Sequence, residues 1–246
     1  MDQDAASLDK VAGKYMLDPT EEIENFHVMD WYPQRIFKHT GKVSSLLELG
    51  LGHGYTVDYF SRMTDDHHII EGAPSVIKHF KTKNPSFKGT VHQGFFETFK
   101  TEKKFDLIIM GFVLEHVENP QEVLSYYKKL LTENGKIYVV VPNAKSMNRR
   151  LGVEMGMIDN IYDLNETDHQ LGHLRNFCRE TLRKTVEASG FEVACEEGVY
   201  LKPLPLGFMQ TMDDFQSNLI AMLKVGVDFP DLCVALLFEL TLPKSV

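Results

Sequence analysis

Residues 45–55 have the sequence SLLELGLGHGY, and the prediction of the fold starts from this stretch. An apolar run that contains a single acid, Glu48, leads into three glycines at alternate positions: Gly50, Gly52 and Gly54. The pattern predicts a buried strand that enters a tight loop, followed by a helix over 55–63. Glycines allow left-handed backbone conformations and let a ligand approach the main chain. The N-terminus of the following helix presents unpaired N–H groups, which suit a nucleotide or a carboxylate.

Two classes of cofactor site use such a turn, and the spacing favours one of them. A dinucleotide-binding GxGxxG turn needs a small residue where this chain has Tyr55, so a pyridine nucleotide is disfavoured. Written as Glu-x-Gly-x-Gly-x-Gly, the stretch resembles the first motif of the class I S-adenosylmethionine-dependent methyltransferases. The resemblance implies S-adenosyl-L-methionine as cofactor, S-adenosyl-L-homocysteine as product, and Glu48 near the methionine moiety. A strand-to-helix turn without a ligand is the alternative.

A second strand is predicted over 67–72, and it also ends in an acid. Glu71 follows the loop by about 20 residues, the separation at which a carboxylate reaches ribose hydroxyls in nucleotide-binding βαβ units. We therefore expect Glu71 and the adjacent Gly72 to contact an adenosine ligand. The alternative is an acid that is simply exposed at the end of a strand.

A third strand, predicted over 90–93, leads into two adjacent aromatic residues, Phe95 and Phe96. The methyltransferase resemblance implies that the adenine ring is held here, often by an acid, and Phe95 takes the usual place of that acid. An aromatic ring stacked on a base contributes about 1–3 kcal/mol. We expect one of the two rings to cover the adenine and the other to join the core.

The most specific segment is 105–120, FDLIIMGFVLEHVENP. Its apolar run fits a central parallel strand that is buried on both faces. The Leu-Glu-His-Val turn, the Asn-Pro pair and a helix over 121–131 are similar to the fourth motif of small-molecule methyltransferases, which implies that Met110 to Phe112 flank the cofactor. His116 follows the carboxyl end of the strand, where open α/β sheets bind ligands. It is either a proton acceptor or a structural hydrogen-bonding group.

The remaining elements complete the prediction of the fold. Asn134-Gly135 is expected to end the helix and to precede a fifth strand over 136–141. The alternation of strands and helices predicts an α/β protein with a doubly wound, mostly parallel sheet and helices on both faces. The resemblance implies seven strands in a Rossmann-like sheet, the last one antiparallel. The C-terminal elements are a helix over 180–189, a strand from 191, a helix over 212–225 and a strand within 231–242.

Two segments lie outside the ordered motifs. Residues 1–42 predict a cap of helix, turn and helix on a methyltransferase domain of residues 43–246. Its aromatic residues either pack against the sheet or form a lid, with Tyr15 as a candidate cofactor contact. Residues 143–179 are polar and without strand alternation, and they follow the fifth strand, where such enzymes commonly add substrate-recognition structure. Loops carry function disproportionately.

This insertion gathers groups that can handle protons and charge. Asp168, His169 and His173 bring together a carboxylate and two imidazoles, and nearby arginines could hold a carboxylate or phosphate. Histidine titrates near neutrality and can accept a proton from a hydroxyl or amine. For a hydroxyl acceptor we expect His173 or His169 as the base, then His116; an amine requires none. The two histidines of the insertion lack suitably spaced further ligands, so no metal is expected. A solvated loop is the alternative.

The composition fits a soluble globular protein: 25% of residues are charged and 43% hydrophobic. The 26 Lys and Arg against 35 Asp and Glu leave a net charge of −9, which disfavours a nucleic acid partner. No apolar run is long enough to cross a membrane, and the N-terminus lacks the pattern of a signal peptide. Three widely separated cysteines make no disulfide pattern, so a cytoplasmic location is expected.

Three functions are compatible with these observations. The first is an S-adenosylmethionine-dependent methyltransferase that acts on an oxygen or nitrogen of a small metabolite. The second is a methyltransferase acting on a protein or nucleic acid, and the third is a non-catalytic module that binds the cofactor. The acidic balance and the polar insertion favour the first. A homodimer is compatible with an apolar helix near the C-terminus.

Overall fold

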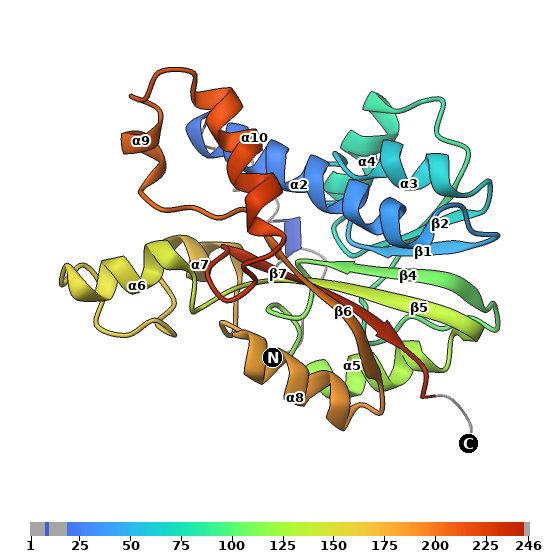
Figure 1. The fold of residues 1–246 in the computed structure, drawn as a ribbon. Helices are drawn as coiled ribbons and strands as arrows, with labels where there is room; N and C mark the ends of the chain where they lie inside the picture. The colour runs from blue at the N-terminus through green and yellow to red at the C-terminus, as the bar shows by residue number, and fades with distance from the viewer. Residues whose placement is uncertain (1–7, 10–18, 244–246) are drawn as a thin grey trace.

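A computed structural model describes residues 8–9 and 19–243 of the chain. Seven strands form an open sheet in the order β3-β2-β1-β4-β5-β7-β6, with helices on both faces (Figure 1). The strands are β1 (Leu46–Leu49), β2 (His67–Glu71), β3 (Thr90–Gln93), β4 (Phe105–Gly111), β5 (Leu131–Pro142), β6 (Glu192–Val199) and β7 (Ala235–Thr241). The helices are α2 (Pro19–Thr40), α3 (Val57–Met63), α4 (Pro74–Lys83), α5 (Pro120–Lys128), α6 (Met147–Glu154), α7 (Glu166–Leu171), α8 (Arg179–Ala188), α9 (Leu206–Met209) and α10 (Phe215–Gly226).

The direction of the strands confirms the predicted doubly wound architecture. The pairs among β1 to β5 are parallel, whereas β7 runs antiparallel to both β5 and β6. Parallel strands place their carboxyl ends at one edge of the sheet, so the loops that follow β1, β2 and β4 converge there. This convergence is what can assemble a site from motifs that are far apart in sequence.

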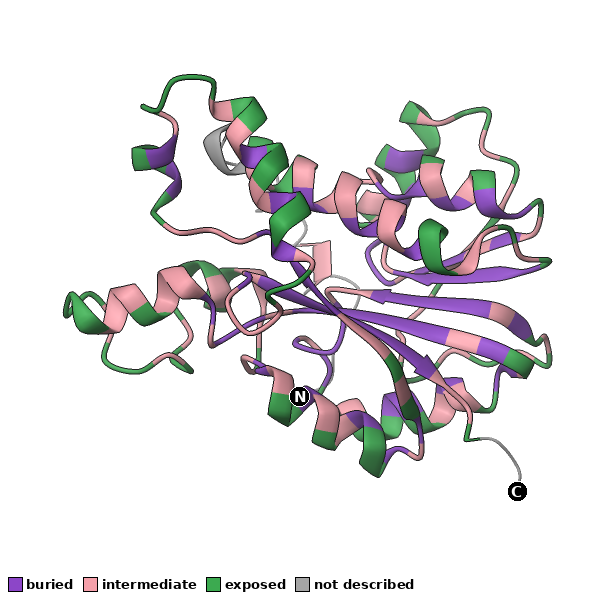
Figure 2. Ribbon diagram, in the orientation of Figure 1, coloured by how far each residue is buried: buried purple, intermediate pink, exposed green. Residues whose placement is uncertain are grey.

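The period-two alternation of strand side chains divides the core into two layers. Leu47 and Met110 belong to the layer under α5 and α8, whereas Leu46 and Ile109 belong to the layer under α2, α3 and α10. Figure 2 shows the central strands buried along most of their length. A residue's register in β4 therefore decides whether its side chain faces one helical layer or the other.

The passage from α5 to β5 differs from the prediction. The helix ends at Lys128, and Asn134-Gly135 lies inside β5 instead of ending the helix. The N–H of Phe105 donates to the carbonyl of Leu130 at 2.7 Å, and β5 begins at Leu131, five residues before the predicted start at Lys136. The Asn-Gly pair is accommodated by a register shift, in which Leu131 and Lys136 both pair with β4.

The described N-terminal residues are helical at 8–9 and form one long helix, α2, so the expected helix, turn and helix stays a prediction. Helix α2 begins at Pro19, as the breaker and the following acids predict, and it continues through Pro33. Val28 and Ile36 are buried in the same core cluster as residues of β1 and β4, so α2 packs directly on the sheet. Tyr15 lies outside the described residues. The division into 1–42 and 43–246 remains a prediction.

The insertion after β5 is more ordered than its polar sequence suggests. It contains two helices, α6 and α7, where the sequence showed only a polar segment without strand alternation. Helix α7 forms because Asn165 and Asp168 make a reciprocal capping box, which pairs backbone N–H groups at its start. Gly172 ends the helix in the left-handed conformation, with φ of 80°. These two ends fix where the next residue, His173, leaves the helix.

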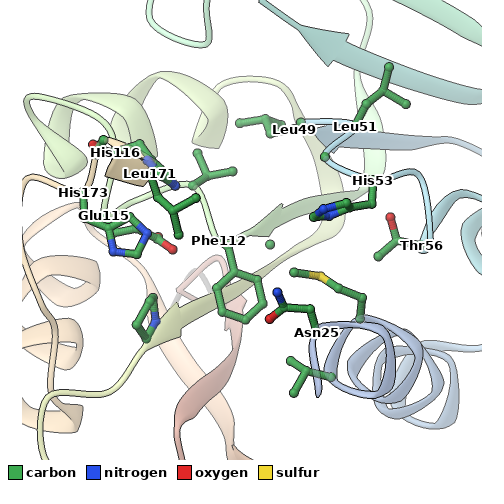
Figure 3. Close-up of a pocket in the computed structure, with 18 of the residues that line it drawn as sticks. Asn25, Leu49, Leu51, His53, Thr56, Phe112, Glu115, His116, Leu171 and His173 are labelled. Carbon is green, nitrogen blue, oxygen red and sulfur yellow. Dashed lines mark hydrogen bonds between the residues drawn. The ribbon is translucent and has the colours of Figure 1, made fainter. Parts of the chain in front are cut away.

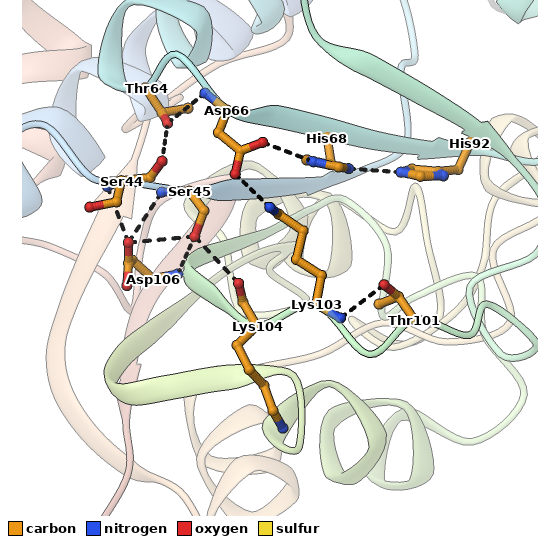
Figure 4. Close-up of polar contacts among 10 residues, drawn as sticks. All are labelled: Ser44, Ser45, Thr64, Asp66, His68, His92, Thr101, Lys103, Lys104 and Asp106. Atoms are coloured by element: carbon orange, nitrogen blue, oxygen red, sulfur yellow. Dashed lines mark hydrogen bonds and ion pairs between the residues drawn. The ribbon is translucent and has the colours of Figure 1, made fainter.

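At the amino ends of the strands, polar side chains pair with one another (Figure 4). Asp106, on β4, accepts hydrogen bonds from the backbone N–H groups of Ser44 and Ser45, both at 3.1 Å. The carboxylate of Asp66 lies 3.0 Å from Nε2 of His68, near the amino end of β2. This edge of the sheet is held together by groups that satisfy each other.

Candidate active site

A cleft with a volume of about 1630 Å³ opens at the carboxyl edge of the sheet. Its wall includes α2, the glycine loop after β1, the end of β2, the segment after β3, the turn after β4, and the insertion. In Figure 3 the glycine-loop residues Leu51 and His53 lie on one side, Glu115 and His173 on the other, with Phe112 between them. The cleft therefore has two ends of different chemistry.

The glycine loop forms the first end. Gly50, Gly52 and Gly54 all have left-handed backbone conformations, with φ of 86°, 48° and 78°. Gly50 and Gly52 line the cleft, and no described atom lies within 4 Å of the position that a Cβ would take on Gly52. Gly54, which was also predicted to bind the cofactor, instead packs against the ring of Phe80 on α4. The exposed backbone at Gly52 fits a ligand that approaches the main chain closely.

Glu48 is buried behind this loop and borders the cleft. Its carboxylate accepts a hydrogen bond from the hydroxyl of Thr56, at the start of α3, and lies 3.1 Å from Nε2 of His67. The residue thus ties the end of β1 to the first turn of α3 and to β2. The sequence predicts a cofactor contact for Glu48, and the structure adds this bracing of the glycine loop.

Glu71 lies at the end of β2, beside the loop. One carboxylate oxygen accepts from the N–H of Leu51 at 3.0 Å and the other from the N–H of Ala73 at 2.8 Å. Burial raises the pKa of Glu71, against the opposing effect of these hydrogen bonds. Because each carboxylate oxygen has about two lone-pair sites, Glu71 keeps acceptor capacity for ligand hydroxyl groups.

Both predicted aromatic residues border the same end of the cleft. The ring of Phe95 lies 3.8 Å from the Cβ position of Gly72, whereas Phe96 approaches Gly50 at the same distance and packs against the core. Leu8 lies directly against Gly72 from the N-terminal side. A flat group that enters beside Gly72 would meet apolar side chains, as an adenine ring requires.

The end of β4 places one predicted cofactor contact, the side chain of Met110, away from the cleft. The side chain of Met110 is buried in the layer under α5 and α8 and does not line the cleft, because strand alternation turns it to that side. Gly111 and Phe112 do line the cleft, and the hydroxyl of Tyr32 lies against Gly111. Phe112 has a φ of 57°, a strained value for an aromatic residue. Such strain concentrates at ligand-binding sites.

The second end of the cleft is formed by Glu115, His116 and His173. The rings of His116 and His173 meet edge to face, with their centroids 4.8 Å apart. Burial lowers the pKa of His116 to about 4, and the neighbouring His173 acts in the same direction. The imidazole of His116 is therefore neutral at physiological pH. His169 is exposed and does not line the cleft, so the structure does not support its predicted catalytic role.

Glu115 is the functional candidate that the sequence analysis missed. It is fully buried, and neither carboxyl oxygen has a hydrogen-bond partner among the described residues. Burial raises its pKa to about 7, opposed mainly by the electrostatic interaction with His173. Its position directly after a central strand was the available signal. An unpaired buried carboxyl group is costly, and such groups concentrate at functional sites.

Asp168 supports this end of the cleft from α7. Its Oδ1 lies 3.2 Å from Nδ1 of His173, although the angle departs from that of an ideal hydrogen bond, and its Oδ2 lies 3.8 Å from Arg149. Burial acts to raise the pKa of Asp168, but the contacts with His173, with the N–H of Asn165 and with Arg149 hold it below its usual value. Asp168 is therefore ionised and can orient the ring of His173.

The arginines of the insertion are engaged by the protein itself. The guanidinium of Arg175 donates to the carbonyl groups of Leu114, Val117 and Glu118, which fixes the turn after β4. Arg149 borders the cleft and donates to the carbonyl of Ile161 at 2.8 Å. The structure thus gives Arg175 a structural role in place of the substrate contact that the sequence suggested.

A family model described as a methyltransferase domain matches residues 22–196, which is more than half of the chain. The chain belongs to this family, and together with the seven-stranded fold the match confirms the prediction of a class I S-adenosylmethionine-dependent methyltransferase. Among curated proteins, none matches the sequence.

Solved structures of methyltransferases share the fold. An S-adenosylmethionine-dependent methyltransferase from Mesorhizobium loti is 13% identical, with a TM-score of 0.61 over 87% of this chain and 97% of that one. The N-methyltransferase NodS from Bradyrhizobium japonicum, with bound S-adenosyl-L-homocysteine, is 14% identical, with a TM-score of 0.57 over 94% and 91% of the chains. The plantazolicin methyltransferase BamL, also with S-adenosyl-L-homocysteine, is 16% identical, with a TM-score of 0.60 over 96% and 90%. At these identities the likeness concerns the fold.

Within residues 8–9 and 19–243, no helix is both long enough and apolar enough to cross a membrane.

Proposed function

We propose that this protein transfers a methyl group from S-adenosyl-L-methionine to an oxygen or nitrogen of a small metabolite. The observation that carries the proposal is the pairing, in one cleft, of an open glycine loop beside Glu71 with an unpartnered acid and two histidines at the other end. The first end suits an adenosine compound. The second offers polar groups to a methyl acceptor.

The residues at the first end would hold the cofactor by three kinds of contact. The backbone at Gly50 and Gly52 can approach its amino acid portion, Glu71 can accept from its ribose hydroxyl groups, and Phe95 can cover its adenine. When bound, the cofactor supplies an electrophilic methyl group on a sulfonium. The protein's task is then to position the acceptor and to exclude water.

The second end would position the acceptor. Glu115, His116 and His173 face the cleft together, and Asp168 orients His173. Two chemical roles suit the imidazoles: proton acceptor for a hydroxyl substrate, which is the role expected from the sequence, or ligand of a cation. An amine acceptor that loses its proton to water requires neither.

Two features favour a small molecule as methyl acceptor: the net charge of the protein and the enclosure of the cleft. The net charge of −9 opposes a nucleic acid, and α2 and the insertion both contribute to the cleft wall, which leaves room for a small molecule. NodS, a relative in fold, is named as an N-methyltransferase, and BamL was solved with a plantazolicin analogue. We also propose a cytoplasmic location, because the three cysteines are free and a reducing compartment suits them. A homodimer stays a prediction.

The test begins with calorimetric titration of S-adenosyl-L-homocysteine, for which we expect a dissociation constant in the micromolar range. A screen of small acceptors with methyl-labelled cofactor then measures turnover. Binding without transfer to any acceptor would favour a non-catalytic module. Salt-sensitive methylation of a nucleic acid or protein would favour a macromolecular substrate. Absence of cofactor binding would refute the proposal.

A further inference from the structure

Three potential ligand atoms converge at the second end of the cleft. One atom each from Glu115, His116 and His173 lies within 4.8 Å of the others. Glu115 and His116 follow β4, whereas His173 follows α7, so the fold brings together groups that are well separated in sequence. Figure 3 shows the three residues on the same side of the cleft. The sequence analysis expected no metal because it found no further ligands for His173, and the tertiary structure supplies two.

The two imidazoles are oriented as metal ligands usually are. Nδ1 of His116 lies 3.4 Å from the carbonyl oxygen of Gly172, a group that can only accept a hydrogen bond. Nδ1 of His173 faces the carboxylate of Asp168 at 3.2 Å without making a hydrogen bond with it. With the proton on Nδ1 of each ring, each Nε2 would have its lone pair free to coordinate. A carboxylate or carbonyl group on the distal nitrogen is the common support of a metal-binding histidine.

The carboxyl group of Glu115 lacks a compensating charge in direct contact. Arg175 is the nearby cation, but its guanidinium donates to the carbonyl groups of Leu114, Val117 and Glu118 and makes no hydrogen bond with Glu115. Buried acids are normally paired or coordinate a metal. Among the described residues, no cationic group makes direct contact with the carboxyl group of Glu115. A bound metal ion would supply this positive charge.

We propose that Glu115, His116 and His173 bind a divalent transition-metal ion with open coordination positions toward the cleft. Two imidazoles and one carboxylate suit Zn²⁺, Mn²⁺, Fe²⁺ or Co²⁺. Ligand bonds of about 2.0–2.2 Å allow at most about 4.4 Å between ligand atoms, which is close to the 4.8 Å within which these atoms lie.

This inference rests on the proposed function and adds a role for the ion, which is to select the methyl acceptor. Open positions on a divalent ion bind oxygen donors, so the acceptor is an oxygen-bearing molecule such as a hydroxy acid or a phenol with a neighbouring oxygen. Both Nε2 lone pairs are then used for coordination. His116 and His173 serve as ligands, and the ion lowers the pKa of a bound hydroxyl group.

A second group of potential ligands provides the matched control. His39, Cys195 and Glu197 also lie within 4.8 Å of one another, on α2 and β6. Here the carboxylate of Glu197 accepts two hydrogen bonds from the guanidinium of Arg35, at 2.5 and 2.7 Å. It also lies 2.7 Å from Nε2 of His39. Its charge is compensated by protein groups, so we expect no cation at this cluster.

The experiment titrates Co²⁺ into the full-length, untagged, metal-free protein and follows the visible absorption of the bound ion. We expect one site per chain, with affinity falling at least about 100-fold in Glu115→Gln and His173→Gln, and about tenfold in Asp168→Asn. His39→Gln and the exposed-residue variant His169→Gln should bind Co²⁺ like the unchanged protein. Thermal melting of every variant checks that the fold is retained.

The outcomes separate this proposal from the proposed function. No Co²⁺ binding, loss of binding in His39→Gln, or a thiolate band indicating Cys195 would overturn the metal site while leaving the methyltransferase proposal standing. Failure to bind S-adenosyl-L-homocysteine would refute the methyltransferase proposal, whatever the metal result. Electron paramagnetic resonance of Mn²⁺, broadened on addition of an oxygen-bearing acceptor, would show that acceptor and ion share the site; an unchanged spectrum with an acceptor that is methylated would refute the acceptor role.

Discussion

Two acids bracket β4, and their surroundings differ completely. At the amino end, Asp106 accepts from the N–H groups of Ser44 and Ser45 and from the hydroxyl of Thr132. Beyond the carboxyl end, Glu115 is fully buried and accepts from no described side chain or neighbouring backbone group. The fold thus pairs the acid at the amino end of β4 with protein groups and leaves the acid beyond the carboxyl end without a hydrogen-bond partner among the described residues.

The difference shows that the two edges of a parallel sheet have different roles, one in stability and the other in ligand binding. At the amino edge, paired groups such as Asp106 stabilise the register of neighbouring strands, because hydrogen bonds to a charged group are stronger than those between neutral groups. At the carboxyl edge, an unpaired group costs stability and gains the ability to bind a ligand. Changes at the amino edge should alter folding without altering binding, and changes at the carboxyl edge should do the reverse.

The largest effect is expected from Gly52→Val in the glycine loop. Valine is strained at the φ of 48° found here, and its side chain would occupy the open space through which a cofactor meets the backbone. We expect affinity for S-adenosyl-L-homocysteine to fall at least about a thousandfold, or about 4 kcal/mol, by calorimetry. Gly41→Val is the matched control before the amino end of β1, since Gly41 has a φ of 69° and no described atom near its Cβ position. It should lower the melting temperature and leave affinity unchanged; equal losses of affinity would contradict the contrast.

The next effect is expected from Asp106→Ala. The substitution leaves the N–H groups of Ser44 and Ser45 without their acceptor, which should lower the free energy of unfolding by about 3 kcal/mol. Denaturant titration measures the change. Affinity for S-adenosyl-L-homocysteine in the folded protein should stay within about twofold. A selective loss of affinity would mean that the amino edge also supports the site.

A smaller effect is expected from Glu71→Gln, which keeps the shape of the side chain and removes its charge. Loss of a charged acceptor for the ribose should weaken S-adenosyl-L-homocysteine binding by about tenfold to thirtyfold. Because burial raises the pKa of Glu71, the unchanged protein should also lose affinity on acidification, beginning above the usual carboxyl pKa of about 4.3. Calorimetry across this pH range should show no such loss in the variant. An identical pH profile would exclude Glu71 as its cause.

The smallest effect is expected on the stability of Glu115→Gln in metal-free protein. Removing a buried carboxyl group without partners should leave the free energy of unfolding unchanged or raise it by about 1 kcal/mol. This outcome would be opposite in sign to that of Asp106→Ala, although both variants lose an acid beside β4. A fall of several kcal/mol in the free energy of unfolding would show that Glu115 has a stabilising partner. It would also contradict the contrast between Glu115 and Asp106.

Much of the cofactor end was predictable because its signals are local. The run into Gly50 and Gly52, and the acid Glu71 at the end of the next strand, follow from spacing along the chain. The errors arose where side-chain direction mattered. Met110 was assigned to the cleft by its position in a motif, but strand alternation turns it into the core, and His169 lies on the exposed side of a helix that no sequence pattern had shown.

The order of motifs along the chain was enough to predict the family, the doubly wound sheet and the edge at which a cofactor is expected, since glycine spacing and apolar periodicity act over a few residues. The composition of the opposite end of the cleft depended on folding. His116 contacts Gly172, which lies 56 residues further along the sequence, and no local pattern at either residue predicts the contact. Such contacts come from how α7 is capped and where it packs against the turn after β4, which are properties of the assembled molecule.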